Sequence, residues 1–285
     1  MSKNDIHKKA MELRAMANKC QSSKDAAILY EKAARMFEMV SFEEAIEAYG
    51  WAGDQYRESG NKKKAIECYL AAGKLAMRDN VLLAIAFFEE AAKLGSIEGL
   101  DNAIMLLRTE LITRRPILAS EHIEVANLKN TLAHLLLIKK DISGAKETFL
   151  SASYNAIKGN YPFFAGLLCI KAAELAHGEE QRKIASLAYH YFSQGAAQEK
   201  NRDYEWFAKN VCMQAVASVL AGTNSEQIIS QCKKAALLAE KHAVFSDNKR
   251  LFRCIVAILQ KEEIKNCPIS VVLEYIKKYL SRRPG

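Results

Sequence analysis

Proline and glycine are scarce in this sequence, with four prolines and thirteen glycines among 285 residues. Because these residues interrupt regular elements and build tight turns, their scarcity favours long helices over a sheet-rich fold, and no alternating strand pattern occurs. Long apolar runs are also missing, since stretches such as residues 81–88 fall far short of the ~20 residues that span a bilayer. The first residues are polar and contain no apolar signal core. We therefore expect a soluble, cytoplasmic protein.

Motifs for catalysis and for metal or nucleotide binding are absent from the sequence. It contains no Cys-x-x-Cys pair, no His-Glu-x-x-His and no glycine-rich phosphate loop. The seven cysteines are odd in number and spread along the chain, which predicts buried reduced thiols rather than a disulfide framework. Adjacent acidic pairs such as Glu43 and Glu44 diverge by about 100° around a helix, so they are interpreted as surface charges. We predict a protein that is not an enzyme and that carries no cofactor and no metal.

The sequence does contain a repeat of the form Ala-x-x-x-Tyr/Phe-x-x-Ala-Ala/Gly. On a helix these positions share one face, where the ring fills the gap to a neighbouring helix and the small pair admits a facing backbone. Self-similarity at a fixed period predicts stacked helical units. The copies return every 19 or 20 residues, beginning at Ala26, Ala45, Ala65 and Ala84, with rings at Tyr30, Tyr49, Tyr69 and Phe88.

These signals predict an all-α fold, a right-handed tetratricopeptide-like α-solenoid of about fourteen antiparallel helices. We assign residues 1–285 to one α-solenoid domain, with a helical-repeat array over 1–220 and a C-terminal helical bundle or cap over 221–285. Ser41 and Glu44 predict a capping box, and Gly60 predicts a left-handed helix end. The helices are predicted over residues 5–19, 25–39, 41–60, 62–77, 81–94, 97–113, 120–138, 142–157, 163–176, 180–198, 204–220, 225–242, 248–261 and 269–280.

The stretch from Ala26 to Leu94 resembles the soluble NSF attachment proteins (SNAPs). The resemblance is carried by Tyr30-x-x-Ala33-Ala34-x-Met36-Phe37, by the turn Glu58-Ser-Gly-Asn-Lys-Lys-Lys-Ala65 and by the helix with Phe88-x-x-Ala91. It implies a twisted sheet of antiparallel helices with a C-terminal bundle. It also implies binding to SNARE helical bundles and recruitment of the hexameric ATPase that dismantles them.

Two features depart from that family. Some SNAPs carry a hydrophobic membrane loop between the first two helices, whereas residues 20–24 here are short and polar. The family's C-terminus is acidic, whereas this chain has ten Lys/Arg against four Asp/Glu from Lys241 to the end, within a net charge of +8. A basic end engages acidic surfaces, although a solvated helix face is the alternative. We predict that Lys277, Lys278, Arg282 and Arg283 bind a partner.

A second basic candidate is the run Lys62, Lys63 and Lys64. It begins a predicted helix, where cations oppose the helix dipole, which indicates an acidic contact, with a solvent-facing turn as the alternative. Trp51 and Trp206 suit partner anchors, although packing is the favoured interpretation for Trp51. Nucleic-acid binding is not expected, because the aromatic residues occupy core-facing repeat positions rather than alternating with Lys and Arg.

We predict a protein-interaction adaptor of SNAP-like type, in vesicle trafficking or SNARE handling, that binds a helical or acidic protein. Outside its complex the chain is expected to be a monomer, and peripheral membrane association is left open. Two alternatives stand beside it. In the first, the chain is a companion subunit that stabilises a larger helical-repeat partner. In the second, it is a tetratricopeptide-like peptide-binding regulator or chaperone.

Overall fold

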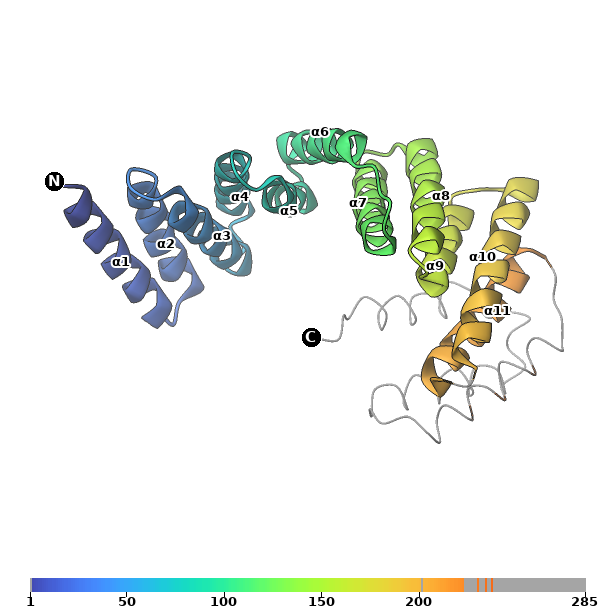
Figure 1. The fold of residues 1–285 in the computed structure, drawn as a ribbon. Coiled ribbons are helices and arrows are strands. Elements are labelled where there is room, and N and C mark those ends of the chain that lie inside the picture. The colour runs from blue at the N-terminus through green and yellow to red at the C-terminus, as the bar shows by residue number, and fades with distance from the viewer. Residues whose placement is uncertain (1, 201, 223–229, 231–233, 235–236, 238–285) are drawn as a thin grey trace. The chain divides into compact units, whose positions relative to one another are not determined.

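The computed structural model describes residues 2–200 and 202–222, together with residues 230, 234 and 237. Within these residues the chain forms eleven α-helices and no strand (Figure 1). They are α1 (Lys3–Lys19), α2 (Ser23–Phe37), α3 (Phe42–Glu58), α4 (Lys62–Ala76), α5 (Val81–Lys93), α6 (Ile97–Thr113), α7 (Ala119–Ile138), α8 (Ile142–Lys158), α9 (Pro162–Glu174), α10 (Gly178–Glu199) and α11 (Tyr204–Leu220).

The all-helical prediction is confirmed for the described residues, and the eleven helices coincide with the first eleven predicted ones to within a few residues at each end. The predicted number of about fourteen is not matched there. Of the other three predicted helices, the one over 225–242 is described only at residues 230, 234 and 237, and those over 248–261 and 269–280 lie outside the described residues, as does nearly all of the predicted C-terminal bundle.

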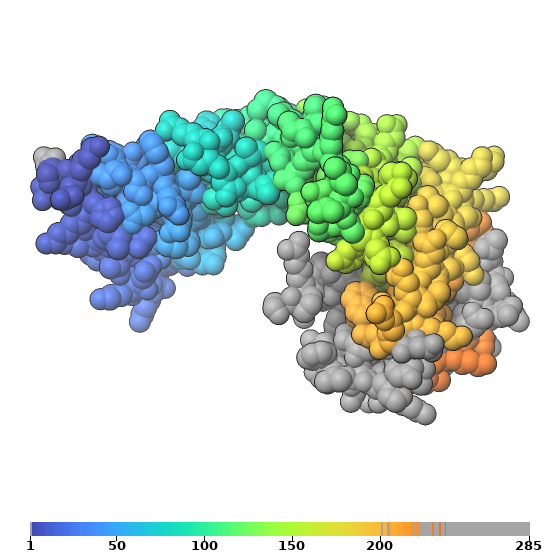
Figure 2. All heavy atoms as spheres, in the orientation of Figure 1, coloured from blue at the N-terminus to red at the C-terminus, as the bar shows by residue number. Residues whose placement is uncertain are grey.

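Contacts divide the chain into two compact units. Unit 1 comprises Met1–Arg115 and Thr131–Asp141, and unit 2 comprises Pro116–Asn130 and the chain from Ile142 onward, so that α7 contributes residues to both. In unit 1, the helices α1 to α6 pack in succession, from α1 on α2 to α5 on α6, and Figure 2 shows their atoms as one closely packed row. In unit 2, α8, α9, α10 and α11 pack in succession. The assignment to one domain and the right-handed coil stay predictions.

Short polar side chains begin the helices of unit 1. A Ser or Asn stands directly before each helix from α1 to α6. Its side chain accepts a hydrogen bond from the backbone N–H of the third residue of the helix, as expected of an N-cap. Ser41 caps α3 as predicted, by accepting from the Glu44 N–H at 3.4 Å. The predicted capping box is corrected, however, because the Glu44 carboxylate meets His7 of α1 at 2.8 Å. Gly60 ends α3 with a φ of 80°, which confirms its predicted role.

Two of the four repeat rings, those of Tyr69 and Phe88, pack on glycines of the preceding helix. The ring of Tyr69 in α4 lies against Gly53 in α3, and the ring of Phe88 in α5 lies against Gly73 in α4. A Cβ atom at these two glycines would lie 2.6 and 2.7 Å from a ring carbon. The two helices can approach this closely only because the glycines have no side chain, so the small residue and the ring of successive units form one contact.

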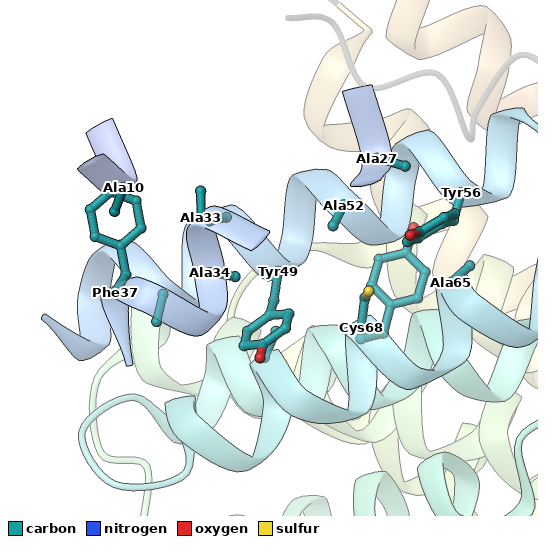
Figure 3. Packing of buried hydrophobic residues seen from close by; sticks show 14 of the residues in the cluster. Ala10, Ala27, Ala33, Ala34, Phe37, Tyr49, Ala52, Tyr56, Ala65 and Cys68 are labelled. Carbon is teal, nitrogen blue, oxygen red and sulfur yellow. The ribbon is translucent and has the colours of Figure 1, made fainter. Parts of the chain in front are cut away.

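The tyrosine hydroxyls at these seams are bound to carboxylates. Tyr69 donates to Asp54 at 2.7 Å and Tyr56 donates to Glu31 at 2.7 Å, and Tyr49 also donates to a carboxylate, that of Glu38. Figure 3 shows the rings of Tyr49 and Tyr56 among the buried alanines of this core. Burial, followed by these hydrogen bonds, raises the pKa of all three phenols above the ordinary value.

Polar contacts also join helices two apart in the chain, across the helix between them. Because contacts of this kind recur along unit 1, successive pairs of helices in unit 1 pack in an equivalent way. The contacts are His7–Glu44 at 2.8 Å between α1 and α3, Lys64–Glu31 at 3.2 Å between α4 and α2, and Arg57–Glu90 at 2.7 Å between α3 and α5.

Candidate functional site

The predicted lysine run forms the first turn of α4. Asn61 caps this helix by accepting a hydrogen bond from the Lys64 N–H at 3.3 Å. The side chains of Lys62 and Lys63 are exposed and form no ion pair with any residue that the structure describes. Both cations therefore stand at the positive end of the helix dipole without a described counter-ion.

Lys64 differs from its two neighbours, because it has acidic partners within the protein. Its ammonium lies 3.2 Å from Glu31 of α2 and 3.0 Å from Glu67 of its own helix. The hydrogen bonds to these carboxylates raise the pKa of Lys64. Lys64 therefore joins α4 to α2 inside the protein, and only Lys62 and Lys63 present free charge.

Glu31 is the centre of that internal contact. It accepts hydrogen bonds from Tyr56, Lys64 and Arg35, and its side chain is 13% exposed. Burial alone would raise the pKa of Glu31, but the three hydrogen bonds outweigh it and hold the pKa below its ordinary value. The carboxylate thus remains charged and links α2, α3 and α4.

A cluster of aromatic and charged side chains lies where α1, α2 and α3 meet. We call Arg14 and Asn18 of α1, Tyr30 of α2 and Glu47 and Trp51 of α3 the Trp51 cluster. The rings of Tyr30 and Trp51 have centroids 5.5 Å apart, and the Tyr30 hydroxyl donates to the Asn18 side-chain oxygen. Trp51 is still 39% exposed. One part of the indole therefore packs, as we favoured from the sequence, while a large part stays open to solvent.

Arg14 is the cation of the Trp51 cluster, and Glu47 is its carboxylate. Its guanidinium lies over two rings, 5.6 Å from the centroid of Trp51 and 5.8 Å from that of the buried Phe37. Its approach to the Glu47 carboxylate is 3.8 Å, too long for a hydrogen bond. Trp51 could be singled out from the sequence as a candidate partner anchor. Arg14 could not, because the residues around it in the sequence do not distinguish it from a solvent-facing arginine.

Trp206 in unit 2 has a comparable environment. It is 41% exposed, its ring lies edge-on to Phe163 of α9 with centroids 5.1 Å apart, and the Lys209 ammonium lies 4.5 Å from its centroid. Both tryptophans singled out in the sequence therefore combine a packed edge, a nearby cation and an exposed remainder. The predicted partner residues Lys277, Lys278, Arg282 and Arg283 lie outside the described residues.

The described cysteines agree with the sequence expectation of reduced thiols. Cys68, Cys169 and Cys212 are buried and Cys20 is half-buried, and none of them is in a disulfide. Burial raises the pKa of Cys68 to about 12 and that of Cys169 to about 11. The described residues contain no group of three or more His, Cys, Asp or Glu side chains placed to hold a metal ion. None of the helices in that part of the chain is long and apolar enough to cross a membrane.

Helix pairs stacked along the chain, with small residues and rings in register, define a helical-repeat protein. No family model and no curated protein matches the sequence. Among solved structures, a chain from the functional characterisation of PilF of Pseudomonas aeruginosa is 13% identical, with 88% of this chain and 98% of that chain covered and a TM-score of 0.44. A de novo designed helical repeat protein is 17% identical, with coverages of 98% and 96% and a TM-score of 0.13. Because both scores are low, the class rests on the packing described above.

Proposed function

We propose that this protein is a non-enzymatic, cytoplasmic scaffold that binds another protein on the outer surface of its helical repeat. The support comes from unit 1, where each helix from α1 to α6 packs chiefly on its chain neighbours. The remaining sides of these helices carry exposed side chains, and helical repeats bind partners on extended surfaces of stacked helices.

The observation that carries the proposal is the exposed first turn of α4. Lys62 and Lys63 lack a described counter-ion at a helix end where cations are disfavoured. An acidic partner would supply the missing charge, and the pair would steer its approach. Lys64 supports the site by fixing this turn to α2 through Glu31. We extend the proposal to Lys277, Lys278, Arg282 and Arg283, whose charge has the same sign.

The particular form of scaffold that we propose is a SNAP-like adaptor for a helical partner. The stretch that carries the resemblance forms α2 to α5, in which ring-to-glycine contacts join α3 to α4 and α4 to α5. Purified chain should then bind an assembled SNARE helical bundle. Because the tail is basic, we expect weak or absent recruitment of the disassembly ATPase. A chain that binds no helical bundle, yet captures a partner through α4, would be a scaffold of another kind.

The test is affinity capture by the full-length chain from host lysate, with mass spectrometry at low and high salt. Charge reversal in the double variant Lys62→Glu, Lys63→Glu should weaken capture of the partner by about tenfold or more, and salt should weaken it as well. The variant should fold, because acidic residues suit a helix N-terminus.

The matched control is the double variant Lys8→Glu, Lys9→Glu, which reverses an equal charge on exposed α1 lysines that pair with no described residue. This control should retain the partner. An equal loss in the two double variants would show that net charge matters rather than the first turn of α4. Capture that is insensitive to both salt and Lys62/Lys63 reversal would contradict the proposed site.

A further inference from the structure

Arg14 is an arginine that is held in place and whose guanidinium makes no hydrogen bond to any described residue. Its side chain is only 22% exposed, and its guanidinium is held over the rings of Trp51 and Phe37. No described residue accepts a hydrogen bond from it, because the approach to Glu47 is 3.8 Å. A guanidinium carries five N–H donors in a rigid fork. These donors are therefore oriented by packing, and none of them is bonded to an acceptor in the part of the chain that the structure describes.

The acceptor that matches such a fork is a planar oxyanion with two oxygens. Carboxylates bind arginine through two parallel hydrogen bonds, and an arginine already stacked on aromatic rings loses little freedom on binding. Glu47 is a weak rival, because its side chain is 52% exposed and its contact is too long. Its charge nevertheless disfavours a multiply charged anion at this place.

Exposed apolar side chains lie beside Arg14, in addition to the Glu47 carboxylate. Trp51 is 39% exposed, and Met11, which lies one helical turn before Arg14 on the same face of α1, is 37% exposed. Exposed apolar side chains next to a held cation suit a polypeptide better than a small hydrated anion, since an apolar side chain can cover them.

We propose that Arg14 and Trp51 form a binding site for an acidic side chain of a protein partner, whose neighbouring apolar residue lies on the indole of Trp51. The carboxylate accepts two parallel hydrogen bonds from the Arg14 guanidinium, and Tyr30 packs against the indole of Trp51. This site rests on the proposed scaffold function, but Arg14 and Trp51 belong to α1 and α3 and not to α4, which carries the lysines.

The test uses the two tryptophans as reporters in the full-length chain. Indole N–H signals of Trp51 and Trp206 are followed by nuclear magnetic resonance in protein carrying nitrogen-15 tryptophan, with Trp51→Phe assigning the pair. The probe is a helical peptide made of the heptad Glu-Leu-Ala-Glu-Ala-Leu-Ala written twice. Control peptides carry Gln or Lys in place of Glu, and inorganic phosphate is titrated separately.

The acidic peptide should shift the Trp51 signal to saturation and leave Trp206 in place as an internal reference. The Gln and Lys peptides should cause no saturable shift. Arg14→Gln should weaken binding at least about tenfold, and Arg14→Lys should give an intermediate loss because it keeps the charge without the fork. Lys9→Gln removes an exposed cation from the same helix and should bind as the parent does.

Equal shifts with the Glu and Gln peptides would overturn the carboxylate assignment. Binding by Arg14→Gln at parental strength would overturn the role of Arg14, provided that its Trp51 signal in free protein shows an intact site. Phosphate shifting Trp51 as strongly as the peptide would replace the proposal with a general anion site. These outcomes are independent of lysate capture through Lys62 and Lys63, so failure of this site and failure of the scaffold function are distinguishable.

Discussion

Gly53→Ala should destabilise unit 1, although the same substitution stabilises most helices. In an open helical position, replacing Gly by Ala stabilises by about 1 kcal/mol. Gly53 is not open, because a Cβ atom there would lie 2.6 Å from the Tyr69 ring, whereas ordinary contact begins near 3.4 Å. The ring would have to withdraw by about 0.8 Å, the difference between those two distances.

The Tyr69 ring has little freedom to withdraw. It is 1% exposed, and its hydroxyl donates to Asp54 at 2.7 Å. Overpacking of this kind costs about 1–3 kcal/mol, and loss of the hydrogen bond adds about 1 kcal/mol. After subtracting the helix-propensity gain, we expect the free energy of unfolding to fall by about 2 kcal/mol.

The assay is urea denaturation followed by helical circular dichroism and by tryptophan fluorescence, since Trp51 lies on the same helix as Gly53. A double-mutant cycle with Tyr69→Leu isolates the contact, because removal of the ring makes room for the methyl group. The double variant should be more stable than the sum of the single changes predicts, by about 1 kcal/mol or more. If Gly53→Ala raised stability, the ring and the glycine would not be in contact, and the packing deduced for every seam of this kind would be wrong.

Three further results are expected. Glu31→Gln should lower the free energy of unfolding by about 2 kcal/mol at neutral pH, through loss of charged hydrogen bonds. Because the folded pKa of Glu31 is depressed, that difference should be complete above about pH 4.5 and vanish as pH falls through the folded pKa, as equilibrium denaturation at several pH values would show. Iodoacetamide at pH 8 should modify Cys20 well before Cys68, whose pKa burial raises to about 12; equal rates by mass spectrometry would contradict the buried assignment. Gly195→Ala should melt at lower temperature than the parent, because its Cβ would lie 2.1 Å from the buried Asn210 side-chain oxygen; an unchanged melting temperature would contradict that packing.

The helices of this protein could be predicted because their ends are encoded locally. Ser41 and Asn61 each accept a hydrogen bond from the backbone N–H three residues later, and Gly60 takes the left-handed conformation between them. Each of these choices depends on a few consecutive residues, so a sequence contains all the information needed. The same holds for Pro162, which starts α9 because its missing N–H is not needed there.

The pairing of rings with glycines could be predicted only in part. The repeat places Tyr69 and Gly73 on one face of α4, which suggests that they serve the same contact. In the structure Tyr69 instead contacts Gly53 of α3, and Gly73 receives Phe88 of α5. The period of the repeat shows which residues share a face of a helix. It does not show which neighbouring helix each residue contacts, because residues of one face of α4 contact both α3 and α5.

The contacts of charged side chains are even harder to predict from the sequence than those of the rings. Lys62, Lys63 and Lys64 are indistinguishable in sequence, yet only Lys64 reaches Glu31, because one residue of helix rotates a side chain by about 100°. Arg14 is 37 positions from Trp51, and their contact exists only because α1 and α3 both lie against α2. Contacts between alternate helices, such as that of Arg14 with Trp51, therefore become visible only when the stack is built. In the stacked arrangement the Arg14 guanidinium lies over the rings of Trp51 and Phe37, and its N–H donors are oriented although no described residue accepts a hydrogen bond from them.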